Sequence, residues 1–341
     1  MASANELRWN GRPGHYEVYY LTITEPRSGV GVWIRYTMLA PVSGPAGTEG
    51  SGPTCSLWFL AMDPRPGAAP TVARKATYGI ERLQAAREPF SLQISDATLT
   101  DEGMTGAFED VSWELRWPPA PRAYEPVHPV LQRLRVAKTV LVLPHAHVPV
   151  EGRVVLPGGE TLELAGTHGG QAHLWGSKHA SSWAWVHCND FTTAEGGPVD
   201  AFIDGVSVTV PRLGREMGPN TPVLARIDGA EFRSTAPLRI LRNASRYGLE
   251  GWRFEATDGA LRVVGEVEPA RDQLAGVTYH DPDGEQAYCY NTETASMRLE
   301  VHERSRRGGG WSPLRTLVSA GRAHYEVGQR RPAEGLELLT N

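Results

Sequence analysis

VGVWIRYTM, residues Val30–Met38, decides the fold class, because its apolar side chains recur at every second position. A repeat of two residues puts alternate side chains on opposite faces and is typical of a β-strand. The same alternation, with many β-branched and aromatic residues, recurs along most of the chain, for example at His15–Ile23, Leu57–Met62, Phe90–Ile94, Trp113–Trp117, Trp183–Asn189, Val206–Val210, Leu261–Val267 and Met297–His302. We therefore predict an all-β protein.

The 37 Gly and 26 Pro residues support this prediction, because they stand in short clusters between the alternating runs, where turns are needed. Long antiparallel chains close their sheets into sandwiches or barrels to protect the edges. Only Gly79–Glu88 resembles a short helix, and Gly214–Pro222 is expected to be an exposed loop. The proline-rich run Pro118–Pro129 fits either a linker or a rigid loop across a barrel mouth.

Composition excludes several classes of protein. The net charge of −5, from 34 Lys and Arg against 39 Asp and Glu, gives no electrostatic case for a nucleic-acid partner. The first residues lack the apolar run of a signal peptide, and the longest apolar candidate, Thr139–Leu143, is far too short to span a membrane. The three cysteines are widely spaced, which predicts buried, reduced thiols in a cytoplasmic protein rather than disulfides or a zinc-thiolate site.

Histidine and tryptophan are concentrated in one part of the chain. Six of the 11 His and three of the 10 Trp residues lie there, namely His145, His147, His168, His173, Trp175, His179, Trp183, Trp185 and His187. If residues 183–189 form a strand, Trp183, Trp185, His187 and Asn189 share one face. Two indoles, an imidazole and an amide on one face are typical of an apolar ligand pocket with a few polar groups.

Three interpretations of these histidines remain open. In the first, His145, His147, His173 and His187 surround a metal ion, although no carboxylate stands at an evident ligand spacing. In the second, each histidine is bonded to backbone carbonyls and is structural. In the third, one or two of them transfer a proton inside an aromatic pocket, a role that suits a side chain with a pKa near neutrality.

The run from Trp175 to Phe191, WGSKHASSWAWVHCNDF, resembles the signature of the tocopherol cyclase family. It is also similar to the carotenoid hydratases (hydroxyneurosporene synthases) and the lipocalin-like Diels–Alderases. Gly251-Trp252, Tyr279–Thr292 and the closing His324–Gly328 follow in the order of the family's C-terminal half. Just before Trp-Gly the chain departs from the family, which tends to carry polar or charged residues there, and His173 is the nearest polar candidate.

The resemblance implies two lipocalin-like β-barrel or β-sandwich domains, an N-terminal one over residues 1–195 that ends with the His/Trp motif and a C-terminal one over residues 196–341. It also implies a hydrophobic small-molecule substrate of the isoprenoid or polyene class and redox-neutral addition to double bonds, with no cofactor. The expected activity is that of a cyclase or hydratase in secondary metabolism. A Diels–Alderase-type pericyclase, a non-catalytic carrier of a hydrophobic ligand and a metal-dependent enzyme are the alternatives.

The expected catalytic residues are His187, His173 and Asn189, with no metal ion and no transmembrane segment. The expected substrate-binding residues are Trp175, Trp183, Trp185, Trp33, Tyr36 and Trp252. Substrate identity and oligomeric state are left open at this point.

Overall fold

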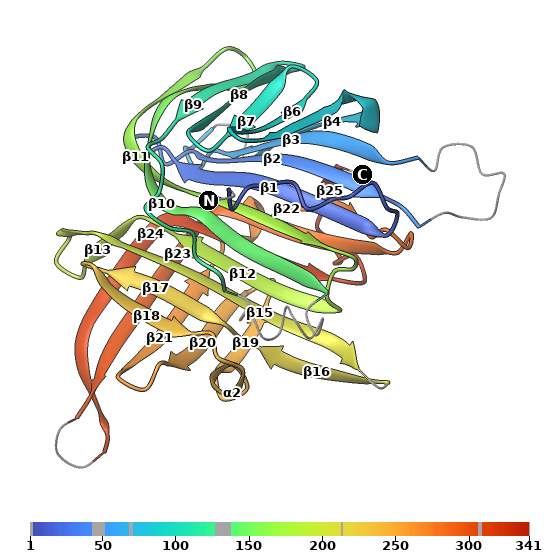
Figure 1. Cartoon of the computed structure of the whole chain (residues 1–341). Helices are drawn as coiled ribbons and strands as arrows, with labels where there is room; N and C mark the ends of the chain where they lie inside the picture. Colours follow the sequence, from blue (N-terminus) through green and yellow to red (C-terminus); the bar gives the residue numbers. More distant parts are fainter. Residues whose placement is uncertain are drawn as a thin grey trace.

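The computed structural model describes residues 3–42, 52–67, 71–126, 138–212, 214–305 and 309–340, and it consists almost entirely of β-strands in two stacked sheets (Figure 1). This confirms the predicted all-β class. No helix in these ranges is long and apolar enough to cross a membrane. Residues 127–129 of the proline-rich run fall outside the described residues.

The first sheet has 11 strands in the order β4-β3-β2-β1-β11-β10-β9-β8-β7-β6-β5. A 3-10 turn, η1 (Ile80–Arg82), joins β4 to β5, the two ends of this path. Its strands are β1 (His15–Thr24), β2 (Gly31–Ala40), β3 (Thr54–Met62), β4 (Thr71–Gly79), β5 (Leu83–Arg87), β6 (Phe90–Ile94), β7 (Ala97–Thr100), β8 (Gly103–Phe108), β9 (Val111–Arg116), β10 (Thr139–Val155) and β11 (Thr161–Gly176).

The second sheet has 14 strands around the path β18-β17-β15-β12-β24-β23-β21-β20-β19. Two short helical turns lie among them, α2 (Pro237–Ile240) and η2 (Arg271–Gln273). The strands are β12 (Ser182–Cys188), β13 (Phe191–Thr193), β14 (Pro198–Val199), β15 (Ala201–Arg212), β16 (Arg215–Asn220), β17 (Val223–Ile227), β18 (Ala230–Ser234), β19 (Ala244–Gly248), β20 (Gly251–Thr257), β21 (Leu261–Glu268), β22 (Ala275–His280), β23 (Gln286–Arg304), β24 (Trp311–Gln329) and β25 (Leu338–Thr340).

Two local expectations were wrong. Half of the possible helix Gly79–Glu88 is strand β5, and only Ile80–Arg82 forms a 3-10 turn, because the side chains form no buried apolar stripe that would hold a helix against the sheet. The expected loop Gly214–Pro222 contains the exposed strand β16, which pairs with β15. Backbone pairing to a long neighbouring strand stabilises this segment where its own side chains bury little.

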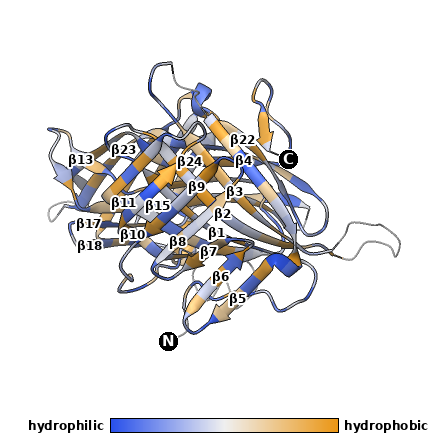
Figure 2. Cartoon of the chain, turned by 90° about the horizontal axis from the view of Figure 1, so that it is seen from above, coloured by the Kyte–Doolittle hydropathy of each residue, from blue (hydrophilic) through white to orange (hydrophobic). Residues whose placement is uncertain are grey.

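Apolar side chains form three separate cores. One lies on the inner face of the first sheet and one on the inner face of the second. The third, which we call the inter-sheet core, takes side chains from both sheets and includes Tyr20, Trp33 and Trp58 of the first with Trp183 and Trp185 of the second. Hydrophobic and hydrophilic residues alternate along many strands (Figure 2), as the period of two requires. The two sheets are thus joined by a buried, aromatic layer.

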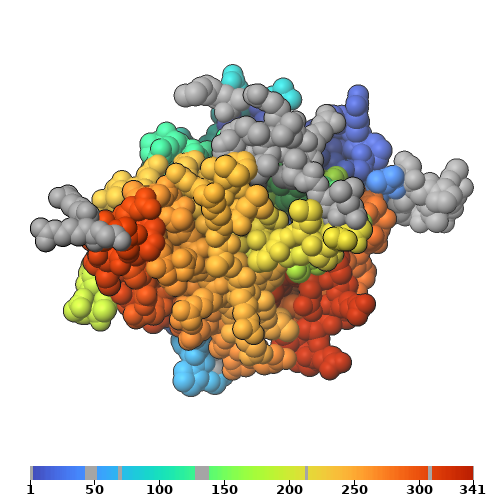
Figure 3. All heavy atoms as spheres, turned by 90° about the horizontal axis from the view of Figure 1, so that it is seen from below, coloured from blue at the N-terminus to red at the C-terminus, as the bar shows by residue number. Residues whose placement is uncertain are grey.

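Along the chain, the last strand of the first sheet, β11, ends at Gly176, and the first strand of the second sheet, β12, begins at Ser182. The His/Trp strand β12 pairs with β15 and β24 of the second sheet. Seen from below, residues of the second sheet form most of the visible surface (Figure 3). The domain boundary near residue 195 stays a prediction. The position of β12 at the sheet junction is what places its side chains between the two halves of the chain.

Candidate functional site

Strand β12 alternates as predicted. Trp183 and Trp185 belong to the inter-sheet core, and Ala184, Val186 and Cys188 to the inner core of the second sheet. The Trp185 ring meets Tyr20 of the first sheet edge-on at 5.0 Å between centroids. The polar and aromatic face of β12 therefore points at the first sheet rather than into the second barrel.

His187 is fixed by hydrogen bonds at both ring nitrogens. Its Nδ1 lies 3.0 Å from Asp204 Oδ2 and its Nε2 lies 3.0 Å from the carbonyl oxygen of Ala146. The same Asp204 oxygen accepts a hydrogen bond of 2.9 Å from Trp185 Nε1. Gly170 on β11 makes room for the ring, because a Cβ there would lie 2.2 Å from His187 Nε2. His187 is thus locked between both sheets.

A second His–carboxylate pair lies beside the first. His324 on β24 is the register partner of His187, and its Nδ1 is bonded to Glu293 on β23. Burial raises the pKa of Glu293, and the nearby charge of His324 opposes that shift. The His324 ring lies 4.2 Å from the Trp185 ring. Its Nε2 is buried and has no hydrogen-bond partner among the described residues. His324 is therefore oriented by a carboxylate at one nitrogen and available at the other.

Arg35 on β2 brings a positive charge into the same layer. Its side chain is 6% exposed, and its guanidinium carbon lies 4.2 Å from the Tyr279 ring, 5.2 Å from the Trp33 ring and 5.5 Å from the Trp58 ring. Within the described residues, no Asp or Glu oxygen lies within 4.0 Å of it. An unpaired buried charge costs several kcal/mol. Each cation–π contact offsets about 0.5–2 kcal/mol of that cost.

His173 lies on the opposite face of the first sheet from His187, so the structure does not bring these two predicted catalytic residues together. Its Nε2 lies 2.8 Å from Glu17 Oε1 and its Nδ1 lies 2.8 Å from the carbonyl oxygen of Ala4. Its ring stacks on Tyr19, a residue of the first sheet's inner core. His173 thus ties the N-terminal segment to the first barrel.

Glu17 is the centre of that arrangement. Its two oxygens also accept hydrogen bonds from the Arg8 and Trp9 amides and the Tyr19 hydroxyl, and Oε2 lies 2.9 Å from His15 Nε2. Burial alone would raise the pKa of Glu17, but the bonds to the histidines and amides outweigh it and lower the pKa to about 2. The folded state therefore strongly favours the ionised carboxylate.

We expect Glu17 to make the protein sensitive to acid. Its folded pKa is depressed from 4.5 to about 2, so its contribution, about 3 kcal/mol, is present above about pH 4.5 and is lost as the pH falls toward about 2. Glu17→Gln should lower the free energy of unfolding near neutral pH and flatten its fall across this range. Urea unfolding of both proteins from about pH 7 to about pH 2 measures this. Parallel stability curves for the two proteins would contradict it.

The remaining predicted residues are distributed among several places. Asn189 follows β12, and its Oδ1 accepts a hydrogen bond of 3.0 Å from His147 Nδ1. Trp175 is half-buried beside His173, 4.8 Å between ring centroids. Trp33 lies in the inter-sheet core, Tyr36 in the inner core of the first sheet and Trp252 in that of the second. The inter-sheet core therefore unites Trp33, Trp183, Trp185 and His187, but not Tyr36, Trp175 or Trp252.

The four histidines of the metal interpretation do not gather at one place, since His173 and His187 face opposite sides of the first sheet. Among the described residues no group of three or more His, Cys, Asp or Glu side chains is placed to hold a metal ion. Burial lowers the pKa of both His145 and His147 to about 4. The three cysteines are buried and free.

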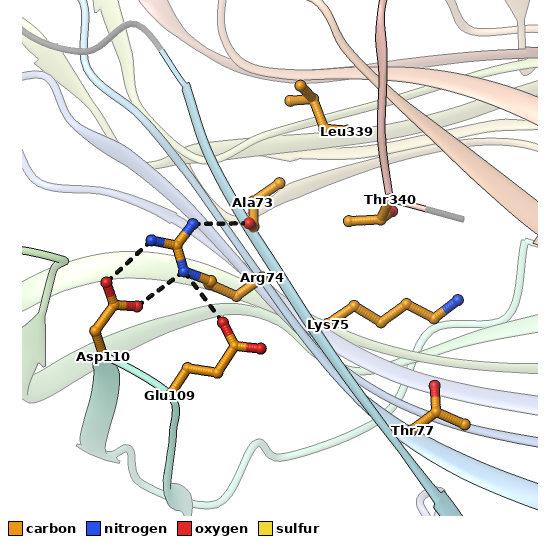
Figure 4. Close-up of a pocket in the computed structure, with 8 residues that line it drawn as sticks. All are labelled: Ala73, Arg74, Lys75, Thr77, Glu109, Asp110, Leu339 and Thr340. Atoms are coloured by element: carbon orange, nitrogen blue, oxygen red, sulfur yellow. Dashed lines mark hydrogen bonds and ion pairs between the residues drawn. The ribbon is translucent and has the colours of Figure 1, made fainter.

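Two open cavities lie in the described part of the molecule. One, of about 500 Å³, is lined by loops around Gly29 and Gln273 and by Thr294 and Arg322, close along the chain to Glu293 and His324. The other, of about 840 Å³, lies over β4 and is lined by Arg74, Lys75, Glu109, Asp110 and the C-terminal Leu339 and Thr340 (Figure 4). None of the residues predicted as catalytic or substrate-binding lines either cavity.

Sequence reasoning missed the carboxylates and one histidine of this layer. Asp204, Glu293, Glu326 and His324 come from three strands that pair with β12 or with its neighbour only in the folded chain. One signal was present in HYEVG, residues 324–328, where His324 and Glu326 alternate with the core residues Tyr325 and Val327. Alternation of this kind is ordinarily typical of a strand whose polar face meets solvent, so the sequence alone does not show that this face is buried.

The same fold occurs in solved structures of low sequence identity. An AttH-like protein from Nitrosomonas europaea matches with a TM-score of 0.55 and 12% identity, over 93% of each chain. CghA, solved with Sch210972, matches with a TM-score of 0.50 and 11% identity, over 93% of this chain and 88% of that one. The chain is thus an all-β protein of the lipocalin-like fold that these structures share.

At the sequence level no profile of a known protein family matches. The uncharacterized proteins Rv0493c and MT0513 of two Mycobacterium tuberculosis strains, H37Rv and CDC 1551, are each 30% identical over 336 residues, which is 97% of this chain and 91% of theirs. The chain belongs to the family of these mycobacterial proteins.

Proposed function

We propose that this protein is a cofactor-independent enzyme of the cyclase or hydratase type, which acts on a double bond of an apolar small molecule held between the two sheets. The observation that carries the proposal is the buried His324, bonded to Glu293 through Nδ1 and with Nε2 unpartnered among the described residues. A carboxylate that orients one imidazole nitrogen leaves the other ready to give or take a proton.

The proposed reaction is a proton transfer followed by capture of a carbocation. The Nε2–H of the His324 imidazolium gives its proton to one carbon of the double bond. The π electrons form the new C–H bond, the N–H electrons stay on Nε2, and positive charge develops on the other carbon. A hydroxyl of the substrate or a water molecule adds to this carbon and loses its O–H proton to Nε2. Where a second double bond closes the ring instead, the cation moves to a carbon of that bond, and a neighbouring C–H gives its proton to Nε2 as a new double bond forms. The reaction needs no oxidant or reductant.

The aromatic residues stabilise the cation in this proposal. Trp185 lies against His324, and an indole face attracts positive charge through its quadrupole. Glu293 carries a raised pKa and orients the histidine, while Asp204 holds Trp185 and His187 in place. We assign His187 to positioning, because both its nitrogens are already bonded. The cavity beside Thr294 is the proposed entrance.

A carrier of a hydrophobic ligand is the second candidate. One observation favours it: one ring nitrogen of His187 and one of His173 is hydrogen-bonded to a backbone carbonyl oxygen, as in structural histidines. A carrier would bind the same class of molecule without changing it.

Metabolite profiles of a producing strain separate the two candidates without a prior guess of the substrate. Loss of the gene should remove one metabolite and accumulate its precursor, an isomer for a cyclase or the molecule short of one water for a hydratase. If the gene's loss changes the amount or location of a metabolite and no precursor accumulates, the protein is a carrier.

A further inference from the structure

The Arg35 cage, which we define as Arg35 with Trp33, Trp58 and Tyr279, has no role in the proton transfer proposed above. A buried arginine is ordinarily held by a carboxylate, because its planar fork matches two oxygens and its charge needs compensation. Here aromatic rings from β2, β3 and β22 surround it, and its Nε is buried without a hydrogen-bond partner in the described ranges. The indole N–H of Trp33 is unpartnered in the same way.

A second cation, Lys75, lies against the cage. The Nζ of Lys75, on β4, lies 4.3 Å from the centroid of the Trp58 ring, which Arg35 also contacts. Burial lowers the pKa of Lys75 to about 8, and the charge of Arg35 adds to this shift. Two cations that share one aromatic wall repel each other, and an anion placed between them removes that repulsion.

The cage lies next to an opening and next to the proposed reaction site. Lys75 lines the cavity over β4, where it extends beside Thr340 (Figure 4). The Tyr279 ring of the cage also stacks with the Trp183 ring, at 6.4 Å between centroids. Trp183 is followed on the same face of β12 by Trp185, which contacts His324. This order of groups would match an extended molecule with one charged end at Arg35 and its apolar part along the tryptophans.

We infer that the Arg35 cage binds the anionic head group, a carboxylate or an enolate, of an otherwise apolar ligand. A carboxylate at the guanidinium supplies the acceptor that Arg35 Nε lacks and a counter-charge closer than the layer's own carboxylates, none of which lies within 4.0 Å of Arg35 among the described residues. This inference rests on the proposed function in one respect only, that the ligand is the enzyme's substrate. The substrate class thereby narrows from apolar molecules to apolar acids.

Two fluorescent probes that differ in one charged group test this directly. Anilinonaphthalene sulfonate carries an anion on an apolar ring system, and N-phenylnaphthylamine is its uncharged counterpart. We expect Arg35→Met to weaken sulfonate binding by about tenfold or more and to leave binding of the neutral probe unchanged. Arg8→Met is the matched control, because Arg8 lies 5.2 Å from the Trp175 ring, away from the inter-sheet core. Circular dichroism and thermal unfolding verify that the variants are folded.

Equal binding of the sulfonate by the wild type and folded Arg35→Met would overturn the inference, as would equal loss of both probes. If Arg35→Met does not fold, decanoate and decanol are compared on the wild type. Decanoate should displace the sulfonate at concentrations where decanol does not, and equal displacement overturns the inference. His324→Gln should bind the sulfonate normally, so failure of the cage and failure of the proposed catalysis give different results.

Discussion

His324→Gln is expected to abolish most of the turnover, by about 100-fold or more, because general acid–base groups contribute about 10²–10⁴ to rate. Glutamine retains a polar group near Glu293 but cannot carry a proton to the substrate. A deletion strain restored with this variant should therefore keep the precursor that the deletion accumulates. The measurement is the ratio of product to precursor, with the amount of soluble protein determined in parallel.

His302→Gln is the control for that prediction. His302 is on β23, the strand of Glu293, and lies 3.6 Å from Glu300 rather than in the inter-sheet core. Its replacement should leave the product ratio unchanged. If His324→Gln restores the product as well as the wild type does, His324 is not the proton donor.

Asp204→Ala is expected to destabilise the fold by about 3–5 kcal/mol, the usual cost of removing one partner from a buried charged pair. Asp204 is fully buried, and one of its oxygens accepts hydrogen bonds from both Trp185 Nε1 and His187 Nδ1. Without it both donors remain buried in the inter-sheet core, and His187 has no carboxylate partner. Urea unfolding of purified protein gives the change in free energy.

Glu255→Ala is the comparison, because Glu255 is an exposed carboxylate of the same sheet, on β20, whose partner is Arg262. Exposed ion pairs contribute about 0–1 kcal/mol, so this variant should unfold close to the wild-type midpoint. A similar small effect at Asp204 would show that the His187–Asp204–Trp185 contacts do not hold the two sheets together.

From the sequence one can predict which side chains share a face of one strand, because this depends only on local alternation. The face shared by Trp183, Trp185 and His187 follows from the period of two within one strand, and the structure has that arrangement. The same reasoning fails between strands. His173 and His187 are close along the chain, but they belong to different sheets and face opposite sides of the first one.

Partners from distant strands were beyond the reach of sequence reasoning. Asp204 and Glu293 join their histidines through antiparallel pairing whose register is set by the whole sheet. Arg35 was hidden for another reason. In VGVWIRYTM it reads as a polar residue on a solvent face, and only the second sheet, stacked over it, buries that face. Whether a second sheet covers the outer face of a strand is not visible in the strand's own sequence.

The central claim, that His324 gives a proton to carbon, is tested most directly by forming the product in deuterium oxide. Solvent deuterium exchanges onto the imidazole and is then transferred, so we predict product that carries one deuterium at a carbon position that does not exchange afterwards. Mass spectrometry of the product, compared with that formed in ordinary water, measures this. Product without deuterium at carbon, as a cycloaddition would give, would contradict the account.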